Sequence, residues 1–359
     1  MSHSNPFGIS MDRRGFLKAA GLGSGAALLS RGLAPKFARA QGQPEHFFVF
    51  AYFGGAWDTL MSLDPRDPDE FTDARASETR IQLGWERLDP IFQTGLTRFD
   101  DSPITFGPAM GGMTRHYQDC CVVRGLSMDT LTHEVGRRYM LTGQMPAGLQ
   151  ATGSSIASRI AAQQGDNSPI PNLVSRAETY SKELPAFASG LSVNGAGDLV
   201  LTLERLPGSP VQSVMERINA YRTTRVHCDP SGLNTSGFLD RIREAGIKAE
   251  SLIARGLQTY FNFGANTPEM NQIRQKYGIP NGSSGPGRAS GTPGEQAALA
   301  FQAIKHRVSQ CVTISLATAL DTHDDSWETD HPERLREGFD ALANLIDDLK
   351  DSDLMQKTT

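Results

Sequence analysis

The stretch from residue 46 to residue 58 reads HFFVFAYFGGAWD, and its apolar run decides the fold class. A continuous aromatic and β-branched run without polar alternation is typical of a strand that is buried on both faces of a sheet. Gly54 and Gly55 end the run, and their conformational freedom permits a sharp turn and the close approach of a ligand. Asp58 follows, so the sequence predicts a carboxylate at the carboxyl end of an inner strand.

Similar apolar runs recur along the chain and alternate with segments of helical period. We expect further strands at residues 120–126, 170–174 and 311–320, with short extended segments within 186–208. We expect helices at residues 108–118, 133–141, 154–164, 211–221, 237–263, 295–310 and 333–350. Residues 64–105 indicate surface excursions, and the composition of residues 281–294 predicts a flexible loop. The predicted fold class is therefore α/β, with a mostly parallel sheet covered by helices on both faces.

Composition and charge exclude several classes of protein. The chain has 359 residues, of which 38% are hydrophobic, enough for one large α/β domain or two smaller ones. Four scattered cysteines are too few for a disulfide scaffold or a four-cysteine zinc site. Residues 41–359 hold 29 basic and 39 acidic residues, a net charge of −10. Such a surface repels phosphate backbones, so we expect no nucleic-acid partner.

Residues 1–40 resemble a twin-arginine signal peptide. Arg13 and Arg14 precede a mildly apolar segment, and Ala38-Arg39-Ala40 offers the small-x-small pattern that a signal peptidase accepts. A short amphipathic helix is the alternative interpretation. The signal predicts passage through the bacterial twin-arginine export machinery, and a mature domain of residues 41–359 that is periplasmic or secreted. After the first 40 residues no apolar run reaches the ~18 residues of a membrane span, so no transmembrane segment is expected.

Three polar clusters are predicted at the carboxyl ends of strands, where ligands gather in open α/β sheets. The first is Asp58. The second, residues 129–134 (DTLTHE), precedes a helix, where a hydroxyl or imidazole meets free backbone N–H groups. The third includes Asp321 and His323, whose oxygen and nitrogen atoms could reach one divalent cation.

Each cluster also has a purely structural interpretation. The first could be an Asx turn, the second an N-cap formed by Thr130 or Thr132, and the third a solvated acidic turn. The sequence offers no dinucleotide-binding glycine pattern after a strand, no Walker loop, no H-E-x-x-H and no G-x-S-x-G elbow.

Together these features resemble domain-of-unknown-function family 1501, a family of exported bacterial proteins within the alkaline phosphatase and sulfatase superfamily. The matching segments are the twin-arginine start, Gly54-Gly55-x-x-Asp58, the Thr132-His133 pair before Gly143, and Asp321-Thr322-His323 followed by an amphipathic helix. Members of the family usually have a Ser-His pair and a Gly-Trp-Asp-Thr-His motif. Here Thr132 replaces the serine, and Ala319-Leu320 replaces Gly-Trp.

The resemblance implies a metal-dependent hydrolase that acts on a small phosphate or sulfate ester. It implies Asp58, Asp321 and His323 as ligands of divalent metal ions. Thr132 and His133 are the implied catalytic residues: chemistry favours Thr132 as the nucleophile, whereas spacing favours His133, which could otherwise be a ligand or an acid–base partner. The fold it implies is alkaline-phosphatase-like.

Family members also continue past the last predicted helix into another strand and a later Asp-His pair, whereas this chain stops at Thr359. The resemblance therefore implies a C-terminally truncated domain with an incomplete metal site. Asp347 and Asp348 are expected to face solvent on the last helix. The alternative function is an exported, non-catalytic binding or assembly protein that keeps the hydrolase fold.

Overall fold

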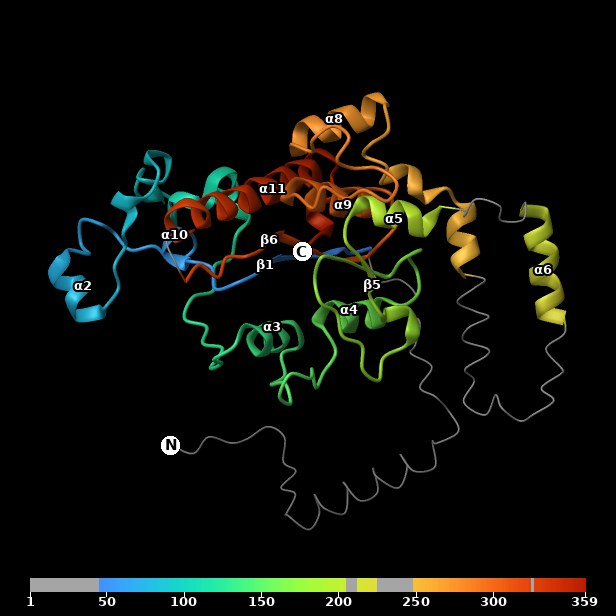
Figure 1. Ribbon diagram of the computed structural model, residues 1–359, viewed down its shortest axis with the longest axis horizontal. Helices are drawn as coiled ribbons and strands as arrows, with labels where there is room; N and C mark the ends of the chain where they lie inside the picture. The colour runs from blue at the N-terminus through green and yellow to red at the C-terminus, as the bar shows by residue number, and fades with distance from the viewer. Residues whose placement is uncertain (1–44, 205–211, 225–247, 324–325) are drawn as a thin grey trace, which may run out of the picture. The chain divides into compact units, whose positions relative to one another are not determined.

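The computed structural model of the protein describes residues 45–204, 212–224, 248–323 and 326–359. Its centre is a four-stranded sheet in the order β1, β6, β4, β5, and all three strand pairs are parallel (Figure 1). The strands are β1 (Phe48–Phe53), β4 (Asn172–Ser175), β5 (Leu191–Val193) and β6 (Cys311–Ala317). Every residue of β6 is buried, as a strand between two neighbours and two helical layers requires. The predicted α/β class with a parallel sheet is confirmed.

Helices cover both faces of the sheet (Figure 1). One layer holds α5 (Ala196–Leu203), α8 (Pro268–Tyr277), α9 (Pro293–Lys305) and α11 (His331–Asp351). The other layer holds α3 (His133–Thr142) and α4 (Ile156–Gln164). Alternate side chains of β1 serve the two layers: Val49 and Phe53 pack against the core under α9 and α11, whereas Phe48 packs against the core beside α4.

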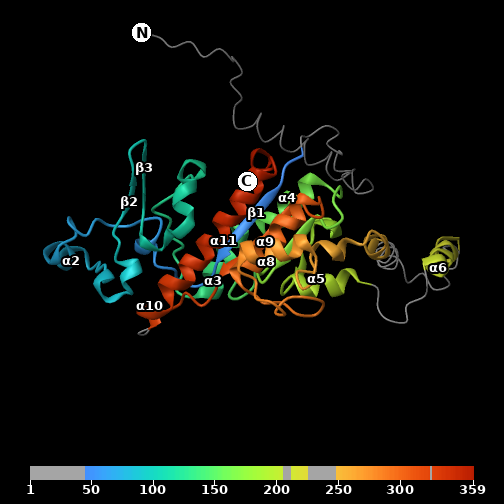
Figure 2. The same ribbon diagram turned by 90° about the horizontal axis from the view of Figure 1, so that it is seen from above.

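Residues 64–105 do more than the predicted surface excursions, because they bury part of a second apolar core. This segment forms α2 (Asp73–Thr79), the 3-10 turns η2 (Trp85–Arg87) and η3 (Pro90–Phe92), and the antiparallel strands β2 (Thr97–Phe99) and β3 (Ser102–Phe106), which Figure 2 shows as a hairpin. Trp85, Leu88 and Phe92 are buried against the side chains of α11. Weak periodicity is therefore compatible with burial when single large side chains supply the contacts.

The predicted strand at residues 120–126 is wrong. These residues follow the 3-10 helix η4 (Pro108–Asp119) without regular structure, and Val123 and Leu126 are exposed. An apolar run alone therefore does not place a segment in the sheet, whose four strands are β1, β6, β4 and β5. The predicted helix at residues 108–118 exists, but as the 3-10 helix η4.

Other boundaries also differ. Residues 186–208 contain the turn η5 (Ala186–Ala188), β5 and α5 rather than extended segments alone. Much of the predicted helix at 237–263 lies outside the described residues; its described part is helical at 248–254 and ends where Gly256 adopts a φ of 66° before η6 (Leu257–Tyr260). Residues 281–292 are irregular, and α9 begins at Pro293. The predicted signal at residues 1–40 lies outside the described residues.

The remaining short elements are η1 (Thr59–Met61), α6 (Gln212–Thr224), α10 (Ser326–Thr329) and η7 (Met355–Lys357). Beyond η7 the chain lies parallel to β1, where the Val49 N–H donates to the carbonyl of Thr359 at 2.8 Å. Among the described helices, none combines the length and the apolar character that crossing a membrane would take.

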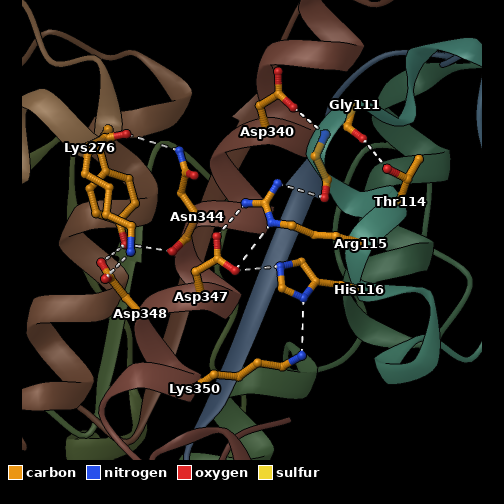
Figure 3. Close-up of polar contacts among 12 residues, drawn as sticks. Gly111, Thr114, Arg115, His116, Lys276, Asp340, Asn344, Asp347, Asp348 and Lys350 are labelled. Atoms are coloured by element: carbon orange, nitrogen blue, oxygen red, sulfur yellow. Dashed lines mark hydrogen bonds and ion pairs between the residues drawn. The ribbon is translucent and has the colours of Figure 1, made fainter.

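A charged network joins η4 to α11 (Figure 3). His116 is buried, and its Nε2 lies 3.1 Å from Oδ1 of Asp347, which also pairs with Arg115. The Lys350 ammonium lies 3.3 Å from Nδ1 of His116 and pairs with Asp119. Burial lowers the pKa of His116 despite the nearby carboxylates. Burial acts to raise the pKa of Asp347, but the Arg115 hydrogen bond and charge hold it below its ordinary value.

The prediction that Asp347 and Asp348 face solvent is therefore wrong. Asp347 belongs to the network just described, and Asp348 accepts hydrogen bonds from the Tyr277 hydroxyl and the Lys276 ammonium of α8 (Figure 3). Helical period shows which side of a helix is apolar, but it does not show which other elements cover its polar side.

Candidate functional site

A cavity of about 880 Å³ lies along the carboxyl edge of the sheet, and it is lined by residues of three strands and by the residue that follows the fourth. β1 contributes Tyr52, β6 contributes Ser315, β5 contributes Ser192, and Arg176 follows β4 directly. His133 of α3 closes one side. This is where an open parallel sheet gathers ligands, because its loops and helix N-termini converge there.

Two imidazoles and a carboxylate meet at the rim of this cavity, which His133 and Asp321 line. Nε2 of His133 lies 2.8 Å from Oδ2 of Asp321, and Nε2 of His323 lies 2.6 Å from Oδ1 of the same carboxylate. One ligand atom from each residue falls within 4.8 Å of the other two. The His323 side chain is 84% exposed, so the cluster is open to solvent. Three side chains that converge in this way could hold a divalent metal ion and leave coordination positions open.

Local backbone geometry explains why Asp321 and His323 act together. Residues 321–323 form no helix, and alternate side chains of such an extended segment point to the same side. Asp321 and His323 therefore meet His133, while Thr322 between them bonds to His331 on the other side. Gly55 permits the close contact with β1: a Cβ there would lie 2.6 Å from the backbone nitrogen of Asp321.

Asp58 takes part in a different set of contacts. Its Oδ1 accepts from the Leu60 N–H at 2.8 Å as the N-cap of η1, and its Oδ2 accepts from the Trp327 indole at 3.0 Å. Both carboxylate oxygens are thus engaged, and the Asp58 carboxylate lies outside the cluster of His133, Asp321 and His323.

His331 connects Asp58 to the cluster's own segment. The backbone N–H of Asp58 donates to Nε2 of this buried imidazole at 2.8 Å, and Nδ1 lies 3.0 Å from the Thr322 hydroxyl. Burial lowers the pKa of His331, which favours the neutral ring that accepts at Nε2. Nδ1 therefore carries the proton and donates it to Thr322. His331 fixes the β1 turn against the segment that carries Asp321 and His323.

Thr132 is the N-cap of α3. Its hydroxyl oxygen accepts from the Val135 N–H at 3.4 Å, so the structural interpretation of this residue holds. Thr132 borders a second hollow of about 540 Å³ between β1 and α3, whereas His133 borders both that hollow and the larger cavity. The two candidate catalytic residues are thus adjacent, but only His133 reaches the carboxyl-edge cavity.

Sequence reasoning missed three further residues of the cavity. Arg137 of α3 pairs with Glu178 at 2.7 Å, which holds α3 to the loop after β4. Arg176 opens that loop with a left-handed φ of 55°. A signal existed, since Arg176 and Glu178 follow the predicted strand at 170–174, at the same edge that pointed to Asp58 and Asp321.

Comparison with curated proteins gives no match, and comparison with solved structures gives none either. A family match does exist and spans the whole sheet and the cluster of His133, Asp321 and His323. Residues 47–359 match the family described as protein of unknown function (DUF1501), and the chain belongs to that family.

Proposed function

We propose that the protein is an exported, metal-dependent hydrolase of phosphate or sulfate esters, with an alkaline-phosphatase-like sheet and its reaction centre at His133, Asp321 and His323. The observation that carries this proposal is the convergence of two imidazoles on one carboxylate in an open cavity at the carboxyl edge. In a buried cluster the same residues would stabilise the fold. Here they are exposed, so their nitrogen and oxygen atoms remain accessible to a bound ion.

The donor set fits a divalent cation. Imidazole nitrogen suits zinc, and a carboxylate oxygen also suits manganese. When bound, such a cation polarises the ester oxygens and stabilises the negative charge of the transition state. Asp58 could join as a ligand only by giving up Leu60 and Trp327, so its role in this proposal is to hold the β1 turn in place.

Thr132 is the proposed nucleophile; it borders the hollow beside the cavity and directly precedes the proposed ligand His133. Its oxygen lies at the N-terminus of α3, where backbone N–H groups and the helix dipole favour a developing alkoxide. The Thr132 hydroxyl passes its proton to water as its oxygen forms a bond to phosphorus or sulfur; the ester oxygen leaves with the electron pair of the broken bond and takes a proton from water. Water then attacks the covalent ester, releasing phosphate or sulfate and restoring the hydroxyl.

The test is turnover of an aryl phosphate and an aryl sulfate by the metal-loaded chain. Thr132→Ala should abolish product formation, whereas Thr132→Ser should retain it, because serine keeps both the hydroxyl and the helix cap. Thr130→Ala is the matched control, since Thr130 lies two residues before Thr132 and borders the same hollow. Unchanged turnover in Thr132→Ala would contradict the proposed nucleophile.

The alternative is a non-catalytic binding or assembly protein. It is favoured by exposed apolar side chains between residues 123 and 149, namely Val123, Leu126, Leu131, Met140, Met145 and Leu149. Exposed apolar side chains of this kind are typical of a site for another molecule where they form one contiguous surface. Metal binding without turnover of either aryl ester would support this alternative over the hydrolase.

Export through the twin-arginine machinery is part of the same proposal, and the exported protein is proposed to be periplasmic or secreted. Changing Arg13 and Arg14 together to lysine should leave the full-length chain in the cytoplasm. A mature chain that begins near Gln41 and still leaves the cytoplasm in that variant would contradict the route.

A further inference from the structure

We propose that Arg176 binds the anionic group of the ligand in the carboxyl-edge cavity, as a fork for two oxygens of a tetrahedral oxyanion. The identity of that oxyanion as the phosphate or sulfate of an ester rests on the proposed function. The binding role of Arg176 rests on the contacts of the cavity alone.

The pairing of charges inside the cavity leaves Arg176 as the group without a partner. Its charged lining residues are His133, Arg137, Arg176, Glu178, Asp198 and Asp321. The Arg137–Glu178 pair neutralises two of them, and Asp321 lies between two imidazoles. Oδ2 of Asp198 accepts from the backbone and side-chain nitrogens of Asn194. In the part of the chain that the structure describes, the Arg176 guanidinium alone among these groups has neither a hydrogen bond nor an ion pair.

The backbone of Arg176 has an unfavourable conformation that the sheet holds in place. Its φ of 55° lies in the left-handed region, which residues with a Cβ seldom adopt. Its N–H is fixed by the carbonyl of Val193 in β5 at 3.0 Å, so the sheet holds the conformation in place. Strained residues of this kind gather at ligand sites, where the conformation directs a side chain that ordinary backbone would turn elsewhere.

A glycine of the loop before α9 packs against the Arg176 guanidinium. Gly291 lies against it so closely that a Cβ at that position would be 2.3 Å from Nη1 of Arg176. The glycine itself has a φ of 68°, so it is suited to the position on two grounds. The loop before α9 therefore confines the side chain, which lowers the entropy that Arg176 would lose on binding an anion.

The chemistry of the site selects the ligand class. A guanidinium presents a planar fork that matches two oxygens of phosphate, sulfate or carboxylate. Ser315 and Thr318 line the same cavity. The Ser315 hydroxyl donates to the Ala317 carbonyl at 3.4 Å, so Thr318 is the hydroxyl proposed to donate to a remaining oxygen. A tetrahedral oxyanion uses donors on several sides, whereas a planar carboxylate uses the fork alone.

The experiment is calorimetric titration of the metal-free chain, kept in chelator at low ionic strength, with inorganic sulfate and separately with acetate. We expect sulfate to bind more tightly than acetate, and Arg176→Gln to weaken sulfate about tenfold or more, as expected for the loss of a charged bidentate contact. Arg176→Lys should give an intermediate affinity, because it keeps the charge and loses the fork.

A matched control exists in Arg80, which is also exposed and left-handed, with a φ of 59° at the end of α2. Arg176→Gly and Arg80→Gly should each raise the melting temperature by about 1–2 °C, since glycine removes the strain. Only the change at Arg176 should weaken sulfate binding. Sulfate affinity within twofold of wild type in Arg176→Gln, or an equal loss in Arg80→Gln, would overturn the proposal.

This test is separate from that of the metal site. His323→Ala should abolish cation binding and leave the sulfate affinity of the metal-free chain unchanged. A chain without hydrolase activity could therefore still bind sulfate at Arg176, and a chain that fails to bind sulfate could still bind the cation.

Discussion

Two clusters in this molecule pair a histidine with an aspartate, and they differ in almost everything else. In the closed cluster, Nε2 of His116 lies 3.1 Å from Asp347; in the open cluster, Nε2 of His133 lies 2.8 Å from Asp321. The His116 side chain is 4% exposed, whereas that of His323 is 84% exposed. The same pair of groups thus serves the fold in one place and remains available to a ligand in the other.

The partners of the two clusters explain this difference. In the closed cluster, Arg115 and Lys350 occupy the remaining sides of Asp347 and His116, so a cation would have to displace existing charges. In the open cluster the third group is a second imidazole, which could itself bind a metal ion. Burial and occupied lone pairs, rather than residue type, separate a structural pair from a binding site.

The substitution with the largest expected effect removes the carboxylate of the closed cluster. Asp347→Ala leaves a buried imidazole and Arg115 without their carboxylate, and we expect the free energy of unfolding to fall by about 1–3 kcal/mol. Urea denaturation at neutral pH measures it. Asp351→Ala, an exposed acid at the end of α11, is the control and should change stability by less than about 0.5 kcal/mol. Equal effects of the two variants would mean that the network contributes nothing to the fold.

The pH dependence of stability sharpens the comparison. Because burial lowers the pKa of His116 in the folded state, the unfolded chain binds the proton more readily. Stability is then fully present above the unfolded value of about 6.5 and is lost as pH falls below it. His116→Gln should reduce that slope between pH 7.5 and pH 5. Urea midpoints across this range decide the matter; a slope that stays as steep in His116→Gln would refute the role of the buried ring.

The smallest predicted effect concerns the backbone beside the open cluster. Ala319 has a φ of 55° two residues before Asp321, at the position where the family pattern has glycine, whereas the residues of the closed cluster all have negative φ. Ala319→Gly should raise stability by about 0.5–1 kcal/mol without changing cation affinity. Thermal unfolding and zinc titration are the two measurements. A less stable variant would show that the Ala319 side chain contributes more through packing than its backbone costs.

The sequence was informative where one physical rule decided the outcome. Residues 311–317 were recognisable as an inner strand because both faces of that strand are covered. Residues 48–53 also form a strand, but it lies at the end of the strand order and is half-buried, so the predicted inner position is wrong. Residues 120–126 have a similar apolar pattern but remain outside the sheet, because an apolar run alone does not show which segments pair. Helical period similarly identified α11, yet it could not show that Arg115 and Tyr277 approach its polar side.

The candidate site, like the fold, could be predicted only in part from the sequence. The carboxyl-edge rule selected His133, Asp321 and His323, and the structure brings these three together. The rule also selected Asp58, which a long-range contact with Trp327 and a local cap hold in another role. Arg176 was overlooked because the rule was not applied to the strand at 170–174, and its left-handed backbone has no signature in the sequence.

The central claim is that the open cluster binds a divalent cation and the closed cluster does not. Calorimetric titration of the chain with zinc at neutral pH tests it most directly. The account predicts one bound ion in the wild type, none in His323→Ala or Asp321→Asn, and one in His116→Gln. A wild-type chain that binds no ion, or a His116→Gln variant that loses the ion as His323→Ala does, would contradict it.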